Sequence, residues 1–352
     1  MANSQKLRGA IIGFGFISGK GHVPAYLERS DVEIVAIADI CSARREAAKA
    51  AIPCIRVYET YAELLLREKD LSFVDISTPP HAHAEIAVAS LKAGLHVLCE
   101  KPLASTLAQA REMLLAAQEA ERVLFPCHNY KYAPVVKAVR GAIDSGNLGG
   151  IKSLTLQTFR YTHAKGVEEW KTDWRREHFF SGGGIAMDHG SHSFYLTFDW
   201  LGGFPTHVSA TTTKLDSRWD TEDTLHCVLK FPHAVANVFL TWSAGARKMI
   251  YTVEGENGAV FVNNDHFEMV RREETLENFS IQSNWMDASH SAWFNSMFDD
   301  FVHAMASRDF VGKDARDSYR CVEVIERCYQ SAREESRMVV IPGDLSFLKG
   351  NR

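Results

Sequence analysis

Three side chains have the types and the spacing that oxidation of an alcohol requires. Asp188 and His192 lie four residues apart, so on a helix they would share one face. Histidine exchanges protons near neutral pH, and the carboxylate could orient its ring or hold a substrate hydroxyl. Lys101 follows an apolar, strand-like run, where its cation could polarise a reacting oxygen. These residue types predict a site that takes a proton from a hydroxyl while hydride leaves the carbon.

The first third of the chain alternates β-rich runs with helical patterns, as a scaffold for such side chains would. Several of the runs are apolar without alternation, which is typical of strands covered by helices on both faces. Residues 1–130 are therefore predicted to form a Rossmann domain, an α/β domain with a doubly wound parallel sheet. The expected strands are Arg8–Ile12, Glu33–Ala38, Ile55–Val57, Phe73–Ser77, His96–Cys99 and Val123–Pro126, and the expected helices are Ser42–Ala51, Tyr61–Lys69, Ala84–Ala93 and Leu107–Glu121.

The pattern changes after a helix expected at Val135–Ser145. Consecutive strands without intervening helices favour a large, open-faced and mainly antiparallel sheet, so residues 131–352 are predicted to form an α+β domain for substrate binding and oligomerisation. Its final segment would be able to pack back on the first domain. The expected strands are Ile151–Tyr161, His207–Lys214, Thr224–Phe231, Asn237–Ser243, Tyr251–Glu254, Ala259–Asn263 and Met338–Ile341, and the expected helices are Ala292–Ala306 and Ser318–Glu335.

A glycine-rich turn, Gly13-Phe14-Gly15-Phe16-Ile17-Ser18-Gly19, follows the first expected strand. A tight turn and a close approach of the backbone to a pyrophosphate need glycine at the first two glycine positions, and the next helix N-terminus faces the anion. Ser18 replaces the third glycine of the usual pattern and is small enough to pack closely. The turn predicts a dinucleotide site that includes Gly13, Gly15, Phe16 and Ile17.

Asp39 ends the second expected strand, roughly 20 residues beyond the turn, where an acid can accept from the ribose 2′-hydroxyl of NAD. The same carboxylate would repel the 2′-phosphate of NADP. Arg44 and Arg45 follow closely and could approach such a phosphate. The sequence therefore favours NAD, with NADP left open.

Two further segments resemble a known family. The first runs from Thr78-Pro79-Pro80-His81-Ala82-His83-Ala84 to Glu100-Lys101-Pro102-Leu103-Ala104. The second is Ser-Gly-Gly-Gly-Ile-Ala-Met-Asp-His-Gly-Ser-His at residues 181–192. Together with the glycine turn they resemble the glucose–fructose oxidoreductase, inositol dehydrogenase and rhizopine-catabolism protein (Gfo/Idh/MocA) family, from about Leu7 to Ile341.

The resemblance implies a catalytic set of Lys101, Asp188 and His192. His192 would be the acid/base, Lys101 would polarise the reacting oxygen, and Asp188 would orient the substrate or the histidine. A cis Lys101–Pro102 bond is also implied. Thr78, Pro79, His83, Glu100, Lys101 and Asn129 would add to the cofactor site, with Lys131 beside Asn129, and the substrate would meet Lys101, Tyr130, His163, Trp174, Arg175, Asp188 and His192.

One departure from the family concerns the residues after His192. They are Ser193-Phe194-Tyr195, where many relatives carry an acid three or four places on. The detailed sugar or cyclitol specificity of relatives therefore does not transfer to this chain.

Composition restricts the partners. A net charge of −5 indicates no nucleic-acid or anionic-membrane partner. Met1–Arg8 has no signal-peptide pattern, and no apolar run approaches the roughly 20 residues of a membrane helix. The seven cysteines include no CxxC pair and are expected to be reduced. We expect a cytoplasmic protein with a small hydroxylated-ring substrate, which forms a homodimer or homotetramer through the open sheet face.

The leading hypothesis is an NAD-dependent oxidoreductase that moves hydride between nicotinamide and a ring CH–OH of a sugar, cyclitol or derivative. A redox-assisted lyase or glycoside-cleaving enzyme, which oxidises the sugar transiently without net NAD consumption, is the alternative. A dinucleotide sensor would need neither Lys101 nor His192. No metal is expected, although Asp188, His189 and His192 have ligand-like spacing. On a helix, His189 would point away from Asp188 and serve as a structural or rim residue.

Overall fold

The computed structural model describes residues 6–272, 274–282 and 290–349. The prediction that Met1–Arg8 is no signal peptide rests mostly on residues 1–5, which lie outside these ranges. No helix among the described residues combines the length and apolar character that crossing a membrane requires.

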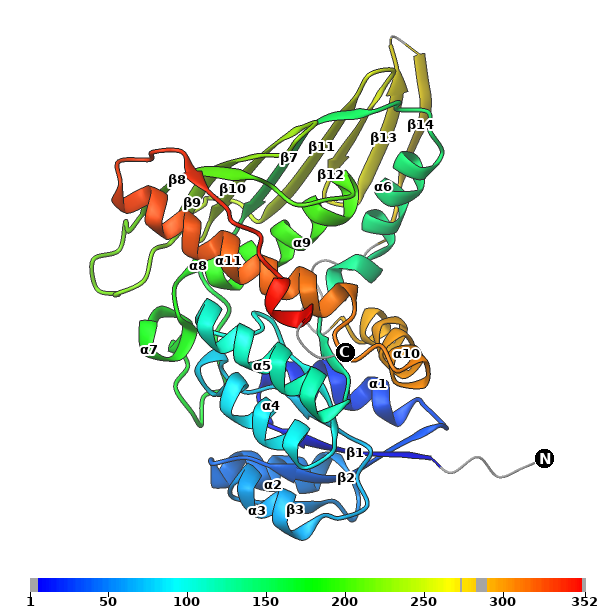
Figure 1. Cartoon of the computed structure of the whole chain (residues 1–352), viewed down its shortest axis with the longest axis vertical. Coiled ribbons are helices and arrows are strands. Elements are labelled where there is room, and N and C mark those ends of the chain that lie inside the picture. The colour runs from blue at the N-terminus through cyan, green and yellow to red at the C-terminus, as the bar shows by residue number, and fades with distance from the viewer. Residues whose placement is uncertain (1–5, 273, 283–289, 350–352) are drawn as a thin grey trace, which may run out of the picture.

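The first sheet has six parallel strands in the order β3-β2-β1-β4-β5-β6 (Figure 1). Ala10 and Ile12 belong to a core on one face, which the helices α3, α4 and α5 cover. Ile11 belongs to a second core on the other face, where α1, α2 and α10 lie. The apolar runs thus have two buried faces, as predicted. The strands are β1 (Leu7–Ile12), β2 (Val32–Ala38), β3 (Arg56–Tyr58), β4 (Phe73–Ile76), β5 (His96–Cys99) and β6 (Leu124–Pro126).

The helices of this domain begin where the sequence supplies caps. The hydroxyl of Thr60 accepts from the backbone N–H of Glu63, and Thr106 accepts from Gln109 in the same way. These caps satisfy N–H groups that the first turn leaves without partners. The helices are α1 (Val23–Leu27), α2 (Ser42–Ala51), α3 (Tyr61–Arg67), α4 (His83–Lys92) and α5 (Leu107–Ala120), and a π-helical segment, η1 (Ser18–His22), precedes α1.

The second sheet has nine strands in the order β14-β13-β12-β11-β7-β10-β9-β8-β15. Within the described part of this sheet, only the β7–β10 pair is parallel and the other pairs are antiparallel. The predicted fold class is therefore confirmed. The strands are β7 (Ile151–Phe159), β8 (His207–Thr213), β9 (Thr224–Lys230), β10 (Val235–Thr241), β11 (Lys248–Gly255), β12 (Ala259–Asn263), β13 (His266–Arg271), β14 (Glu274–Ser280) and β15 (Val339–Val340).

Helices cover one face of the second sheet. All of α9 except Asp199 is buried, because this helix packs against both the sheet and α11. A buried helix can be apolar nearly all round, as the Phe-Tyr-Leu-Thr-Phe run of α9 is. The helices of this half are α6 (Pro134–Asp144), α7 (His178–Ser181), α8 (Ile185–Asp188), α9 (Gly190–Leu201), α10 (Ser291–Ser307) and α11 (Lys313–Arg333).

Two late helices join the halves. Phe294, Phe298 and Phe301 of α10 pack into the core beside β1 and β4 of the parallel sheet. Along α11, Val322 packs into the first domain and Val324 into the core of the second. In Figure 1 α11 runs between the second sheet and α5 of the first domain, and it contacts both β8 and α5. The two halves therefore share continuous packing around the space between them.

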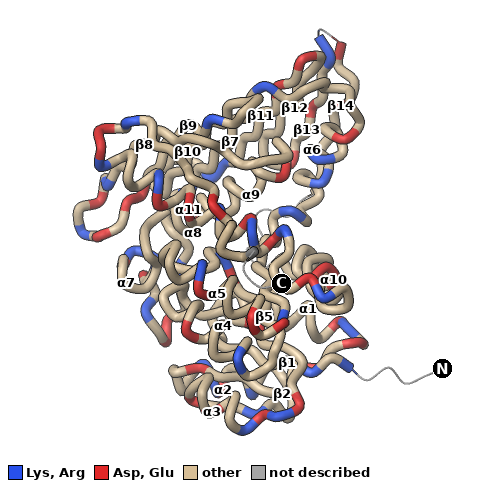
Figure 2. The backbone as a smooth tube through the Cα atoms, viewed as in Figure 1, with Lys and Arg blue, Asp and Glu red and all other residues tan. Residues whose placement is uncertain are grey.

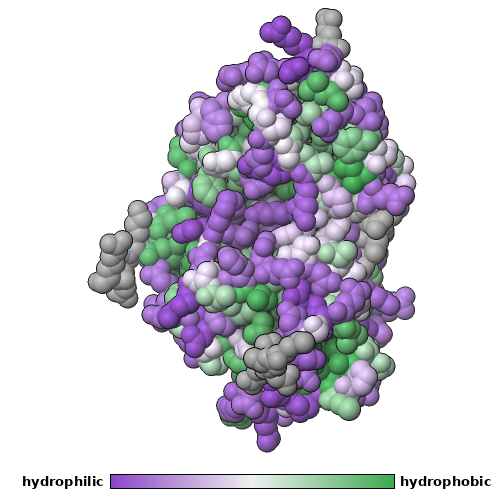
Figure 3. Space-filling view, turned by 90° about the vertical axis from the view of Figure 1, so that its right-hand side faces the viewer, coloured by the Kyte–Doolittle hydropathy of each residue, from purple (hydrophilic) through white to green (hydrophobic). Residues whose placement is uncertain are grey.

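The other face of the second sheet carries alternate residues of each strand. Phe159 and Phe239 contact each other there with ring centroids 5.6 Å apart, and Phe261 is exposed. Over the side of the molecule in Figure 3, hydrophobic residues form separate patches among hydrophilic ones. Figure 2 shows both signs of charge spread over both halves. The homo-oligomer expected through the open face stays a prediction.

Candidate active site

A cavity of about 700 Å³ lies between the two halves of the chain. One wall is the carboxyl edge of the parallel sheet, where ligands of open α/β sheets bind. The other wall comes from the segment after β7 and from α7, α8 and α9. Nearly all the predicted site residues line it: Gly13, Gly15, Phe16, Ile17, Asp39, Thr78, Pro79, Glu100, Lys101, Asn129, Tyr130, His163, Trp174, Arg175, Asp188 and His192.

His83 is the exception, and its prediction as a cofactor contact is wrong for this structure. The ring is fully buried and does not line the cavity. Its Nδ1 lies 3.0 Å from the carbonyl oxygen of Pro102, and its Nε2 lies 2.7 Å from that of Thr78. His83 therefore links the two segments that line the cavity, from behind them.

The glycine turn fits a dinucleotide. Gly13 has φ +93°, and a Cβ there would lie 2.8 Å from the backbone of Ser77. A Cβ on Gly15 would meet no atom of the protein, although Gly15 lines the cavity. Glycine at this position therefore leaves room for something outside the chain, as the pyrophosphate requires. Ser18 is buried, and its hydroxyl donates to the carbonyl of Gly13 at 2.9 Å, which closes the turn.

Asp39 faces the same cavity from the end of β2. One carboxylate oxygen accepts from the backbone N–H of Phe14 at 2.6 Å, and the other accepts from Cys41 at 2.8 Å. Each oxygen has a second lone pair, so the carboxylate can still accept from a ribose hydroxyl. Arg44 lines the cavity and donates to the carbonyl of Phe14, while Arg45 donates to that of Asp39.

The carboxylate of Asp188 is surrounded by basic side chains. Lys101 Nζ donates to its Oδ1 at 2.8 Å, and Arg175 Nε lies 3.5 Å from the same oxygen. His189 Nδ1 lies 3.2 Å from Oδ2, so the prediction that His189 points away from Asp188 is wrong. Burial alone would raise the pKa of Asp188, but the charges of Lys101, His189 and Arg175 hold it well below its usual range. Asp188 is therefore a carboxylate at neutral pH.

A helix boundary separates Asp188 from His192, which the sequence pattern placed on one helix. Asp188 ends α8 and His192 lies in the first turn of the separate helix α9. Asp188 and His192 therefore do not lie on one continuous helix, although both line the cavity. Among the described residues, the hydrogen bonds of Asp188 come from Lys101 rather than from His192. The cis Lys101–Pro102 bond expected from the family is confirmed.

The Gly-Gly-Gly turn before α8 places Asp188. The carboxylate of Glu222 accepts from the backbone N–H groups of Gly184 and Ala186, which are otherwise unpaired at the start of the helix. A Cβ on Gly184 would lie 1.8 Å from the carbonyl oxygen of Glu222, and one on Gly183 would lie 2.0 Å from the hydroxyl of Tyr329. Only glycine permits this close approach.

His192 is held by two aromatic residues. Its ring stacks on Tyr130 with centroids 3.8 Å apart, and Nδ1 lies 2.7 Å from the hydroxyl of Tyr195. That hydroxyl also accepts from the backbone N–H of Tyr130 at 3.2 Å. The bond at Nδ1 leaves Nε2 as the nitrogen available to the cavity. Burial and the charge of Lys101 lower the pKa of His192 well below its usual value, so the ring is neutral at pH 7.

Lys131 does not belong to the cavity, so the expected contact with nicotinamide or substrate is absent among the described residues. Its ammonium pairs with Asp314 at 2.5 Å and with Asp317 at 3.5 Å, both on α11. Burial would lower the pKa of Lys131, but these carboxylates raise it. Lys131 is therefore a partly buried ion-pair partner of α11.

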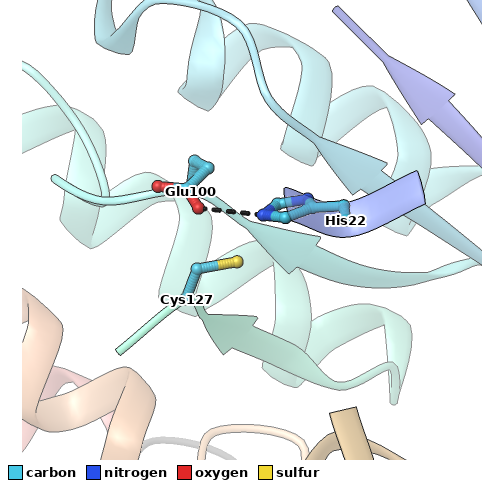
Figure 4. A group of neighbouring side chains, drawn as sticks. All are labelled: His22, Glu100 and Cys127. Carbon is cyan, nitrogen blue, oxygen red and sulfur yellow. Dashed lines mark hydrogen bonds and ion pairs between the residues drawn. The ribbon is translucent and has the colours of Figure 1, made fainter. Parts of the chain in front are cut away.

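His22 and Glu100 belong to a buried polar cluster next to Lys101 in the chain (Figure 4). His22 Nδ1 is 2.8 Å from Asp75, and Nε2 is 3.2 Å from Glu100. Burial alone would lower the pKa of His22, but the two carboxylates raise it to about 9. Glu100 also accepts from the backbone N–H of Lys101 at 3.1 Å. The imidazolium thus holds the carboxylate that contacts the Lys101 backbone.

Cys127 completes a group with His22 and Glu100 whose ligand atoms lie within 4.8 Å of one another. Burial raises the pKa of the Cys127 thiol well above its usual value, and the ring of His22 is protonated. Metal ligands must be deprotonated. The hydrogen bonds of His22 therefore explain this group as a buried charge cluster.

The fold and the cavity define an NAD-binding oxidoreductase. Residues 7–128 match the model of an oxidoreductase family with an NAD-binding Rossmann fold, and residues 140–340 match its C-terminal alpha/beta domain. The chain belongs to the Gfo/Idh/MocA oxidoreductase family.

Named relatives are similar over almost the whole chain. D-apiose dehydrogenase of Paraburkholderia graminis is 28% identical over 94% of this chain and 88% of the relative. D-glucoside 3-dehydrogenase of Escherichia coli is 27% identical over 95% and 98%. GenD2 from gentamicin A biosynthesis, solved with NAD, is 25% identical with a TM-score of 0.82, over 96% of both chains. Levoglucosan dehydrogenase, solved with NADH and levoglucosan, shares the fold with a TM-score of 0.83 at 22% identity, over 96% and 100%.

Proposed function

We propose that this enzyme transfers hydride between NAD and a ring CH–OH of a sugar, cyclitol or derivative. The observation that carries the proposal is the convergence of Lys101, Asp188 and His192 on one cavity with the glycine turn and Asp39. The names of the relatives support the substrate class, since D-apiose dehydrogenase and D-glucoside 3-dehydrogenase are named for sugars.

The side chains divide the work at the hydroxyl. When bound, nicotinamide accepts the hydride or returns it. Lys101 is oriented by Asp188 and directs its charge to the reacting oxygen, where negative charge develops as the proton leaves. His192 takes or returns that proton at Nε2, since its Nδ1 is bonded to Tyr195. Burial in the cavity wall keeps the ring neutral and therefore able to accept a proton.

A substrate panel tests the proposal. The purified protein should form NADH from NAD with at least one member of a panel of sugars, cyclitols and uronates, measured by nicotinamide absorbance. The same panel as keto compounds should consume NADH. If NADH binds and no member of either panel changes its absorbance, the proposed dehydrogenase is wrong. Net formation of NADH would also contradict the lyase alternative, which consumes none.

Tyr195 is proposed to position His192. Replacing Tyr195 with phenylalanine removes one hydrogen bond to His192, worth about 1 kcal/mol. We expect kcat to fall about fivefold with little change in KM, because the ring loses its orientation rather than the substrate its binding contacts. Steady-state kinetics measure this split. A Tyr195→Phe variant with unchanged kcat would contradict the role. Tyr58→Phe, which loses a hydrogen bond to Glu68 away from the cavity, is the matched control.

Asp39 is proposed to select NAD. Replacing Asp39 with serine removes the carboxylate that would accept from the ribose and repel a phosphate, while Arg44 remains nearby. We expect the ratio of kcat/KM for NAD to that for NADP to fall by on the order of tenfold. NADH and NADPH fluorescence titrations should show the same change in binding. The control Glu46→Gln, at an exposed acid, should leave the ratio unchanged. An Asp39→Ser variant with the same ratio as the unmodified enzyme would contradict the assignment.

A further inference from the structure

The substrate end of the cavity is rich in cations. Beyond Lys101, the side chains of Arg160, Lys165, Arg175 and Arg247 line it. Lys165 pairs with Asp173, and Arg175 approaches Asp188, which Lys101 already shares. These contacts account for the charges of Lys165 and Arg175, so the further question concerns Arg160.

Arg160 is buried without a carboxylate in the described part of the chain. Its exposed fraction is 9%. Its side-chain hydrogen bonds use Nη1, which donates to the carbonyl oxygens of Phe159 at 2.8 Å and Lys248 at 3.3 Å. A buried charge costs several kcal/mol unless an opposite charge or a full set of hydrogen bonds compensates it. Two carbonyl bonds at one nitrogen leave the rest of the guanidinium edge for a ligand in the cavity.

The strand register brings the backbone of Arg247 close to that of Arg160. Phe159 of β7 pairs with Lys248 of the antiparallel strand β11, so Arg160 and Arg247 are the next residues across from each other. Burial and the charge of Arg160 together lower the pKa of Arg247. Like charges directly opposite each other repel, and an anion between them would relieve the repulsion.

This pair lies on the catalytic side of the sheet. Burial and the charge of Arg160 both act to lower the pKa of His189, which contacts Asp188. Arg247 lines the same cavity as His192. A group bound by the two arginines would therefore belong to the same small molecule that meets Lys101 and His192.

We infer that the substrate is a sugar or cyclitol carrying an oxyanion, which Arg160 and Arg247 bind. Calling the bound molecule a substrate rests on the proposed function. The anion site itself can be tested without turnover. Guanidinium groups bind carboxylate and phosphate oxygens through paired N–H donors, so the shared chemistry is an oxyanion on the ring or its side chain. A uronate or aldonate and a sugar phosphate are the two sources.

Calorimetry with the enzyme–NADH complex tests the site directly. Glucuronate, gluconate, glucose 6-phosphate and glucose are each titrated into the complex in separate experiments. At least one of the three anionic compounds should bind at least tenfold more tightly than glucose. In Arg160→Gln this advantage should fall at least tenfold, because a charge-assisted hydrogen bond to the anion is lost. Arg160→Lys should restore part of it. The surface variant Arg308→Gln, at an arginine paired with Glu121 outside the cavity, should keep the advantage.

Two outcomes would overturn the inference. One is equal or tighter binding of glucose by the unmodified enzyme, which needs no variant to fold. The other is an Arg160→Gln variant that binds NADH normally and keeps the full anion preference. If anionic sugars bind as expected while no sugar is oxidised or reduced, the anion site stands and the proposed dehydrogenase fails. If only neutral sugars bind and are oxidised, the proposed dehydrogenase stands and the anion site fails.

Discussion

Replacing Lys101 with methionine should lower kcat about a hundred- to a thousandfold. Lys101 lines the cavity and donates to Asp188, and in the proposed mechanism its charge meets the oxygen on which negative charge develops. Loss of one such preorganised group costs roughly 10²- to 10³-fold in other enzymes. Methionine keeps the length and apolar stem of the side chain. Steady-state and single-turnover rates of NADH formation measure the effect.

The pH profile adds a second readout to this variant. Burial, followed by the charge of Lys101, lowers the pKa of His192. Without that charge the pKa should move up, so the acid limb of kcat/KM should appear at higher pH in Lys101→Met. A base must be deprotonated to act, which gives this sign. NADH affinity should stay near the unmodified value, and Lys92→Met, at an exposed lysine of α4, serves as control. A Lys101→Met enzyme with nearly normal kcat would refute the role of Lys101.

The sequence could predict the parts of the site that follow strand ends or short motifs. The glycine turn, Asp39 and Lys101 each follow a strand of the parallel sheet, and carboxyl ends of parallel strands meet at one edge. Their common cavity is a consequence of topology alone. Apolar runs without alternation likewise predicted strands buried on two faces, because no solvent-facing position interrupts them.

Contacts across the two halves were beyond such reasoning. The i, i+4 argument failed because a helix break separates Asp188 from His192, and local spacing does not show where a helix ends. His22 meets Asp75 and Glu100 from distant positions in the chain, and no motif pairs them. Strands β13 and β14 were missed because charged residues such as Glu268 and Glu277 face solvent along them.

Arg160 illustrates the same limit at the substrate end. Its position near the end of the expected strand Ile151–Tyr161 was visible, but its nearness to Arg247 depends on the register between β7 and β11, which are separated by three other strands in the chain. Register is set by packing over the whole sheet rather than by either segment. The proposed anion site of this chain therefore lies at the end of a strand of the second sheet, where no sequence motif marked it.

The second large effect concerns stability, and the His22 cluster predicts it. The pKa of His22 is about 9 in the folded protein and 6.5 when unperturbed. A raised folded pKa contributes stability that is complete below pH 6.5 and is lost as the pH rises through about 9. The difference corresponds to about 3 kcal/mol of unfolding free energy. In His22→Gln, which has no cation to offer Asp75 and Glu100, we therefore expect a deficit of about this size at pH 6.5.

That deficit should narrow steadily between pH 6.5 and pH 9. Over this range the unfolded chain has lost the His22 proton while the folded protein still holds it, so the proton that folding must take up becomes more costly as the pH rises. Denaturant unfolding of both proteins at each pH measures it. The difference between the two proteins is the quantity to follow, because burial raises the pKa values of Cys99, Cys127 and Cys321, and their ionisation on unfolding destabilises both equally at high pH. His303→Gln, at an exposed position of α10, should show no deficit. A His22→Gln deficit that stays constant with pH would mean that packing, rather than a buried charge between two carboxylates, explains the cluster.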